Sequence, residues 1–468
     1  MSESAGGAPS AAAAPPRPAA GQIALALGLL LVELIAGIQT YLSQTVLPLM
    51  AAELNAQSLY GLVTATVLVA NFAGLPLGLG LATRFRIPHL LVAFTLIISA
   101  GAIISALAPT IWWFLLGGTI RGFASGCIAT VSMGAVVVGL PGRVRQITLS
   151  AMSAMWVIAA MLGPVYAAWI SHALNWRWAM VIYLPVLLIA RSIVARHLPD
   201  HDQQQQTQIG WRDSILLAAA MLLIASPSQS QWTQLATLAA GVALLIIATL
   251  RVLPAGTFRM NSKRRTVVAF MFGLCGLYFA VDSVVTIIAH DAFEADAGQI
   301  GMIIMAGGLT WAVVGLYCGW RPAADLRAYR RRASTGVALI AIGVLGMSTS
   351  ANLWLGLEPT AALASGWAIA GVGMGLCYVD SLNMLFNPPD APDGLTHLDV
   401  SNAAVMSESI AAAATTTIAT TYLANSFGGS TAIDDRSTTL LIVIAVVTLA
   451  LAIPLQRLSA TSPAREPG

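Results

Sequence analysis

Residues 22–49, QIALALGLLLVELIAGIQTYLSQTVLPL, form an apolar run that contains a single acidic residue, Glu33, and no basic residue. An α-helix rises about 1.5 Å per residue, so roughly 20 apolar residues cross the ~30 Å hydrocarbon core of a bilayer. This run therefore predicts a membrane-spanning helix. The same criterion predicts thirteen further helices, near residues 58–81, 88–108, 110–140, 146–172, 177–197, 212–227, 231–252, 265–290, 297–320, 333–355, 360–386, 397–424 and 437–457.

The composition of the whole chain supports a membrane protein. Hydrophobic residues make up 57% of the 468 positions and charged residues only 9%, whereas a soluble globular chain carries about 25% charged residues. The net charge of +3 is too small to indicate a nucleic-acid partner. The four cysteines lie in apolar stretches without the spacing of a metal or redox site. No cofactor loop or nucleophile–base pair occurs, so we expect neither a metal, a cofactor nor an enzyme.

The predicted helices fall into groups that define the expected domain organisation. A six-helix bundle over residues 21–198 is followed by a linker with a two-helix insert over 199–262 and by a second six-helix bundle over 263–458. Residues 1–20, rich in Ala, Pro, Gly and Ser, are expected to form a disordered cytoplasmic tail, and residues 459–468 a C-terminal tail. Because the first helix of the insert is short, twelve spans with an interfacial insert stay open as the alternative to fourteen.

The distribution of basic residues indicates the orientation of the chain. Cytoplasmic loops of membrane proteins carry an excess of Lys and Arg. Loops that follow odd-numbered helices contain chiefly Arg177 and Arg436, so both termini are expected to be cytoplasmic. The basic residues in loops after even-numbered helices are Arg84, Arg86, Arg143, Arg145, Arg196, Arg259, Lys263, Arg264, Arg265, Arg327, Arg330, Arg331 and Arg332.

Four short motifs occur in a fixed order along the first six predicted helices. They lie between helices 2 and 3, within helices 4 and 5, and just before helix 6. In order, they contain Gly80 and Arg84, the stretch 116–126 (LGGTIRGFASG) with Arg121, the pair Gly163-Pro164, and the stretch 175–178 (NWRW). Together these motifs resemble those of the major facilitator superfamily, and specifically of its fourteen-span drug:proton antiporter branch.

The resemblance implies an all-α membrane protein with the major facilitator fold. That fold has two six-helix bundles, here with a two-helix insert, giving fourteen transmembrane helices with both termini inside. It also implies a monomer in the cell membrane (plasma or inner), with a small-molecule substrate, protons and lipid as its partners. The chain departs from the family at Thr83, where the family carries an Asp that latches one conformation, and at Ala167-Ala168, where it carries two glycines.

Charged side chains inside a membrane are costly and therefore mark candidate functional residues. Counted from the helix starts, Glu33 and Glu408 lie about 16 Å deep and Arg121 about 15 Å deep, near the bilayer midplane. Asp282 is expected toward the outer end of its helix and Asp380 toward the inner end of its own. All five residues are candidates for proton coupling.

Two interpretations of these five charges stay open. By family resemblance Glu33 and Arg121 line one cavity, where a carboxylate balanced between burial and a nearby cation can exchange its proton as substrate binds. In the other interpretation, Glu33 and Arg121 form a structural ion pair and Glu408 has a satisfied interhelical hydrogen bond. Asp282 and Asp380 would then have structural or mouth-lining roles.

The cavity between the bundles is expected to be apolar and wide. Gln39 lies where the family usually carries an acid in helix 1, so either Glu33 has taken over proton binding or the coupling is unusual. The acids of the outer loop, Asp291, Glu294 and Asp296, are expected to be solvated. The candidate substrate-contacting residues are Gln39, Tyr41, Asn71, Trp156 and Tyr278.

These features predict a secondary transporter that exports hydrophobic or amphipathic, drug-like small molecules in exchange for protons by alternating access. Sugars are less suited to such a cavity because they need several hydrogen-bonding groups. One alternative is an uptake symporter or facilitator for a small metabolite on the same fold. Another is a transport-inactive membrane scaffold or sensor. Collapse of the proton gradient separates the first two, since it raises cellular accumulation for an exporter and lowers it for an importer.

Overall fold

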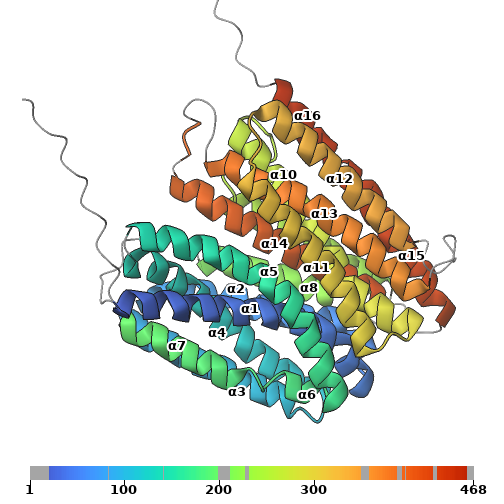
Figure 1. Cartoon of the computed structure of the whole chain (residues 1–468). Helices are drawn as coiled ribbons and strands as arrows, with labels where there is room; N and C mark the ends of the chain where they lie inside the picture. The colour runs from blue at the N-terminus through green and yellow to red at the C-terminus, as the bar shows by residue number, and fades with distance from the viewer. Residues whose placement is uncertain are drawn as a thin grey trace, which may run out of the picture.

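The computed structural model describes residues 20–82, 84–140, 142–198, 211–226, 231–348, 358–386, 393–395, 397–424 and 430–460. Within these residues the regular structure is helical and contains no strand (Figure 1). Helices are the expected form for long apolar runs, because a helix satisfies its backbone N–H and C=O groups internally where no water is available.

The first group of helices corresponds to the first six predicted spans. α1 packs on α5 and α7, α2 packs on α4, and α3 packs on α4 and α7. Asn175 caps the short α6, because its side chain accepts the backbone N–H groups of Arg177 and Trp178. The bounds are α1 (Ala20–Glu53), η1 (Gln57–Leu59), α2 (Tyr60–Ala82), α3 (Ile87–Ala106), α4 (Ile111–Gly139), α5 (Gly142–Ala173), α6 (Trp176–Ala179) and α7 (Leu184–His197).

The last group of helices repeats this arrangement. α11 packs on α13, α12 on α13 and α15, and α10 on α14. Asp296 and Gln299 form a capping box that starts α11. The bounds are α10 (Lys263–Phe293), α11 (Ala297–Trp320), α12 (Leu326–Ser348), α13 (Pro359–Phe386), α14 (His397–Ala424), α15 (Ser430–Leu449) and α16 (Ala452–Ala460). We refer to α1–α7 as the N-bundle and to α10–α16 as the C-bundle.

The insert forms a helical hairpin that contacts both bundles. α8 (Trp211–Ala225) packs on α9 (Gln231–Val252), on α2 and on α14. One apolar cluster joins the four helices, with Phe72 from α2, Met221 from α8, Ala248 from α9 and Ile410 from α14 among its buried residues. The hairpin therefore lies against helices of both bundles through apolar side chains.

The helix boundaries follow the hydropathy with three differences. The prediction 231–252 coincides with α9 and 397–424 with α14, whereas 333–355 was wrong at its start, because α12 begins at Leu326. The early start takes in the arginines of its first turns, which the sequence had placed in a loop. The sixth predicted span is divided into α6 and α7, and the last into α15 and α16. The predicted domain boundaries were not tested.

The two bundles touch at one end of the molecule and diverge toward the other, as Figure 1 shows at its right and left sides. Gly61, at the start of α2, packs on Thr421 at the end of α14, and Gly301, near the start of α11, packs on Pro164 of α5. The hydroxyl oxygens of Thr64 and Thr420 are 3.2 Å apart across the same contact. We call this end, where α1, α5, α10 and α14 finish, the sealed end, and the opposite end the basic end.

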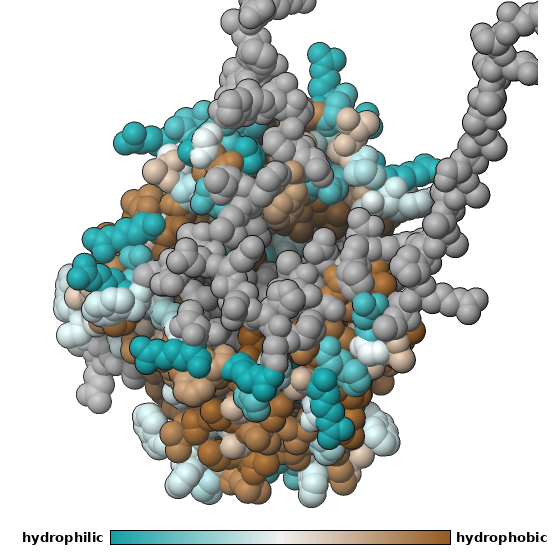
Figure 2. Space-filling model, turned by 90° about the vertical axis from the view of Figure 1, so that its left-hand side faces the viewer, coloured by the Kyte–Doolittle hydropathy of each residue, from teal (hydrophilic) through white to brown (hydrophobic). Residues whose placement is uncertain are grey.

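The surface of the helices is that of a membrane protein. Ten described helical segments are long and apolar enough to cross a bilayer. Figure 2 looks onto the basic end, where hydrophilic side chains spread over the surface and apolar flanks lie beside them. Exposed tryptophans occur near both ends, as expected for residues at membrane interfaces: Trp112, Trp113, Trp169, Trp178 and Trp232 toward the sealed end, and Trp211 and Trp320 toward the basic end.

Candidate substrate and proton site

In the N-bundle, Glu33 of α1 lies within electrostatic reach of Arg191 of α7. Arg191 is only 6% exposed, whereas Arg196 and His197 lie in the last turn of the same helix. A buried guanidinium requires a nearby negative charge, and Glu33 provides it. Glu33 thus interacts with Arg191, a cation that was not among the residues predicted from the sequence.

Arg121 of α4 has a different neighbour. Its charge acts on the buried hydroxyl of Tyr183, which lies just before α7 and near the side chain of Gln39 from α1. The Gln39 Nε2 atom is buried and has no hydrogen-bond partner among the described residues. The N-bundle interior therefore contains one acid near one arginine, and a second arginine beside a tyrosine and an amide.

In the C-bundle, Glu408 of α14 accepts a 2.7 Å hydrogen bond from the hydroxyl of Tyr378 on α13. The ring of Tyr378 is edge-on to Trp311 of α11 at 5.8 Å. Among the described residues, no cation is paired with Glu408. Its carboxylate is instead held by a neutral donor at the border of an aromatic surface.

That aromatic surface is a continuous cluster from three helices. Tyr278 of α10 stacks on Trp367 of α13 with ring centroids 4.6 Å apart, and meets Trp311 edge-on at 5.4 Å. Phe279 contacts both Tyr278 and Trp311. Tyr278 and Trp367 are fully buried, and neither the Tyr278 hydroxyl nor the Trp367 Nε1 atom has a hydrogen-bond partner within the described residues. We call these four residues together with Tyr378 the aromatic cluster.

Asp282 connects the two bundles. It lies one turn after Tyr278 on α10, and its Oδ2 atom accepts a hydrogen bond from Nε2 of Gln44 on α1. The carboxyl also interacts electrostatically with the hydroxyls of Tyr41 and Tyr278. Tyr41 itself lies between Gly163 of α5 and Gly308 of α11. Tyr41, Tyr278 and Asp282 are thus brought together where the bundles meet.

Asp380 is held by groups of its own bundle. Its side chain is 1% exposed, its Oδ2 is 3.1 Å from Nη1 of Arg332, and its Oδ1 accepts the backbone N–H of Ala323 at 3.1 Å. Both carboxylate oxygens are therefore occupied, and the aspartate ties α13 to α12 and to the turn before it. This arrangement favours the structural interpretation of Asp380.

One expectation for the outer loop was wrong. Asp291 is not solvated: its side chain is 6% exposed and accepts a 2.9 Å hydrogen bond from Tyr60 of α2, while His290 Nδ1 lies 2.7 Å away. The contact links the end of α10 to the start of α2 across the sealed end. This contact could not be predicted from the sequence, because Tyr60 and Asp291 are 231 residues apart.

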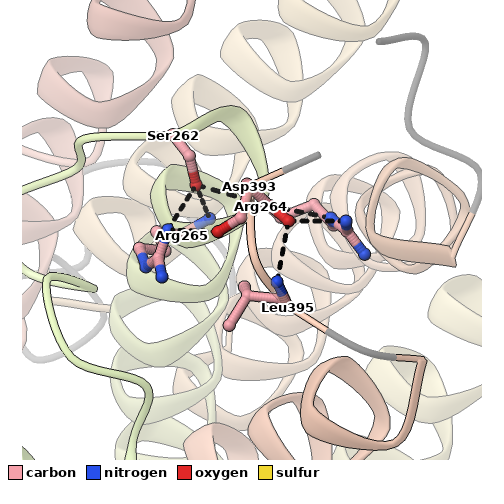
Figure 3. Close-up of polar contacts among 5 residues, drawn as sticks. All are labelled: Ser262, Arg264, Arg265, Asp393 and Leu395. Carbon is pink, nitrogen blue, oxygen red and sulfur yellow. Dashed lines mark hydrogen bonds and ion pairs between the residues drawn. The ribbon is translucent and has the colours of Figure 1, made fainter. Parts of the chain in front are cut away.

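A second polar cluster lies at the basic end of the C-bundle (Figure 3). Arg264, at the start of α10, binds Asp393 through two bonds, Nε to Oδ2 at 2.9 Å and Nη2 to Oδ1 at 2.6 Å. Arg265 donates to the Asp393 carbonyl at 3.1 Å, and Ser262 caps α10 through the Arg265 N–H. Such a bidentate pair fixes geometry, so the segment before α14 is clamped to the start of α10.

The remaining predicted residues lie at the contact between the bundles, at the basic end or within the N-bundle. Gly163 and Pro164 lie at the contact between bundles, against Tyr41 and Gly301. Gly80 and Arg84 are exposed at the basic end. The backbone of Asn71 on α2 packs close to Gly126 of α4. The side chain of Trp156, as well as Thr83, lies outside the described residues.

Sequence reasoning missed Arg191, Gln44, Trp311 and Tyr378, among other residues of the candidate site. A search for charges in apolar runs could have found Arg191. The other three carry no formal charge and gain their importance only from neighbours on other helices. No group of three or more His, Cys, Asp or Glu residues suited to a metal occurs in the described part of the chain.

Comparisons with known proteins agree with this architecture. The chain is similar to a solved peptide transporter POT with a TM-score of 0.67 at 14% identity, covering 94% of each chain. It is also similar to a bacterial homologue of the human lysosomal transporter Spinster, solved in an inward-facing and unoccupied conformation, with a TM-score of 0.64 at 10% identity, covering 96% of this chain and 100% of that one.

Relatives are similar in sequence at low identity. An acurin A biosynthesis cluster MFS-type transporter of Aspergillus aculeatus is 24% identical over 386 residues, 77% of this chain and 68% of that protein. The multidrug efflux pump SdrM of Staphylococcus aureus is 24% identical over 38% of this chain and 40% of its own length. The efflux pump dotC of Dothistroma septosporum is 30% identical over 37% and 30%, respectively. The last two matches span less than half of each protein.

The sequence pattern of the Major Facilitator Superfamily matches residues 29–390. That match covers most of the chain, from α1 of the N-bundle to α13 of the C-bundle, so this chain is a multi-pass membrane transporter that belongs to the Major Facilitator Superfamily and not an enzyme.

Proposed function

We propose that this protein is a secondary active transporter that exports hydrophobic or amphipathic, drug-like small molecules in exchange for protons. The observation that carries the proposal is the arrangement of the bundles. They touch at the sealed end around Gln44 and Asp282, and an aromatic cluster with a second carboxylate, Glu408, lies in the C-bundle. The similarity to efflux pumps supports the direction of transport.

We propose alternating access because the described helices of the two bundles meet at the sealed end and diverge toward the basic end (Figure 1). The arginines near the basic end favour a cytoplasmic location for it. With fourteen spans and both termini inside, we propose that this conformation is inward-facing. The glycines at the sealed end, Gly61 and Gly301, let helix backbones approach closely. Rocking the bundles about the centre would open this end and close the other.

The aromatic cluster and Glu408 define the class of substrate. Trp311, Phe279 and Tyr378 are only partly buried, so they offer flat apolar surfaces within the transporter. A carboxylate beside aromatic rings attracts amphipathic compounds that carry positive charge. Flat apolar surfaces of this kind suit amphipathic compounds better than sugars, which need several hydrogen-bonding groups.

The proton-binding groups are proposed from the same geometry. Glu33 has Arg191 nearby and Asp380 is paired with Arg332, so both charges are compensated. Asp282 and Glu408 interact with an amide and with hydroxyls instead. We therefore place proton coupling with Asp282 and Glu408 ahead of Glu33 and Arg121. The transporter is proposed to act as a monomer in the plasma or inner membrane.

Accumulation in inside-out membrane vesicles tests the proposal. An imposed gradient that is acidic inside should drive uptake of a lipophilic cation into vesicles that contain the transporter, and a protonophore should abolish it. Vesicles without the protein are the control. A requirement for the opposite gradient would establish the uptake symporter. Absence of gradient-driven movement for a broad panel, with folded protein, would favour a scaffold or sensor.

A further inference from the structure

Among the intramembrane acids, Asp282 has an unusual environment. Its neighbours are Gln44 and Tyr41 from α1 and Tyr278 from its own helix, and no cation is paired with it among the described residues. Moving an isolated carboxylate out of water is unfavourable unless the carboxylate is paired with a cation or becomes neutral. Closing the sealed end over an ionised Asp282 would therefore be unfavourable.

The side chain of Gln44 shows how this cost is avoided. Its Nε2 atom donates to Oδ2 of Asp282, whereas its Oε1 atom is buried and has no donor among the described residues. A buried acceptor without a donor is unfavourable because it has lost its hydrogen bond to water. A carboxylic acid can donate its O–H to a neighbouring carboxamide oxygen while its other oxygen accepts the amide N–H. An ionised carboxylate can only accept.

We propose that Asp282 is protonated when the sealed end is closed, and that this proton forms a carboxyl–carboxamide pair with Gln44 that locks the two bundles together there. The inference rests on the proposed function and deepens it by naming the coupling contact. Protonation from the outside closes the sealed end and turns the transporter inward. Release of the proton on the basic side leaves an unfavourable buried charge and returns the transporter to the outward-open state.

In this cycle the proton and the substrate cross the membrane in opposite directions, as antiport requires. The proton-loaded protein moves from outward-open to inward-open, and the deprotonated protein can make the return step with substrate bound. Other ionisable groups lie at the sealed end, among them His290, which contacts Asp291, the partner of Tyr60. A pH effect on closure must therefore be assigned to Asp282 by substitution.

The test measures closure directly and needs no substrate. Spin labels at Ser58→Cys and Gly298→Cys, both exposed at the sealed end, report the distance between bundles by pulsed electron paramagnetic resonance. The four native cysteines are buried. In otherwise wild-type protein in nanodiscs, the ratio of closed to open molecules should rise as pH falls, by at most about tenfold per pH unit for one linked proton.

Asp282→Asn imitates the protonated acid, because its amide can donate to Gln44 Oε1 and accept from Nε2. It should keep the sealed end closed at every pH. Gln44→Leu should weaken closure at low pH and flatten the response, whereas His290→Gln should retain it. A response that persists unchanged in Asp282→Asn, or that disappears in His290→Gln alone, overturns the proposal. Because no substrate is involved, these results are independent of whether the compound class is right.

Discussion

The intramembrane acids of the N-bundle and the C-bundle have different neighbours. Glu33 in the N-bundle is near Arg191, and Arg121 lies within the same bundle beside Tyr183. In the C-bundle, Asp282 and Glu408 are held by an amide and a hydroxyl. A carboxylate compensated by arginine stays ionised, whereas one held by neutral groups in a low-dielectric site can change its protonation. These contacts support our proposal that the acids of the first bundle balance charge and that those of the second exchange protons.

Asp380 is an exception within the C-bundle and gives the largest expected effect on stability. Asp380→Asn removes the charge that pairs with Arg332 while leaving the shape of the side chain unchanged. Loss of one partner of a fully buried pair costs about 3–5 kcal/mol. Because the Arg332 side chain is 27% exposed and can regain water, we expect a smaller loss of about 2–3 kcal/mol in the free energy of unfolding.

Thermal or denaturant unfolding in detergent measures this change. Glu358→Gln is the matched control, since Glu358 is exposed and should alter stability by less than about 0.5 kcal/mol. Asp380→Asn should leave the pH dependence of sealed-end closure intact. If stability is unchanged while that pH dependence is lost, Asp380 belongs with Asp282 as a coupling residue.

A double-mutant cycle tests the pairing in the N-bundle. Glu33→Gln and Arg191→Gln should each destabilise the protein, and the double variant should recover about 1–2 kcal/mol of the summed loss, as expected for neighbouring charges that compensate each other. The matched cycle of Glu33→Gln with Arg121→Gln should show a smaller coupling energy. The reverse ranking would restore the pair expected from the sequence.

Tyr378→Phe should have the smallest effect of these changes, and the effect should be on the apparent affinity for a cationic substrate. It removes the hydroxyl that donates to Glu408 and keeps the ring against Trp311. A hydrogen bond of this kind contributes about 1 kcal/mol, which corresponds to about a fivefold change in the concentration of a cationic substrate that gives half-maximal transport. Tyr317→Phe, at an exposed position, is the control. Equal effects of the two changes would remove Glu408 from the substrate site.

Much of the fold was predictable because hydropathy determines where a chain can cross a membrane. The residues of α9 and α14 match the predicted runs, and the family motifs identified the superfamily correctly. The start of α12 was not predictable in this way, because Arg327 and Arg331 belong to helical turns while remaining exposed at the basic end. The prediction of fourteen spans and of their orientation remains a prediction.

The candidate site was only partly predictable for a geometric reason. Counting residues along a helix gives the depth of Glu33 or Glu408 but not the direction in which each side chain points. The neighbours therefore could not be predicted: Arg191 beside Glu33, and Gln44 beside Asp282, 238 residues away. Gln44 is also uncharged, so a search for intramembrane charges passes over it.

Substrate-driven proton movement in proteoliposomes tests the central claim most directly. Wild type, Glu33→Gln and Asp282→Asn would be reconstituted in equal amounts and challenged with a panel of lipophilic cations and neutral drugs. We predict proton flux in wild type, flux within about threefold of wild type in Glu33→Gln, and a loss of more than tenfold in Asp282→Asn, because the sealed end of that variant stays closed. Flux that is lost in Glu33→Gln and retained in Asp282→Asn would contradict the assignment. Folded wild-type protein that moves substrate without protons would contradict antiport itself.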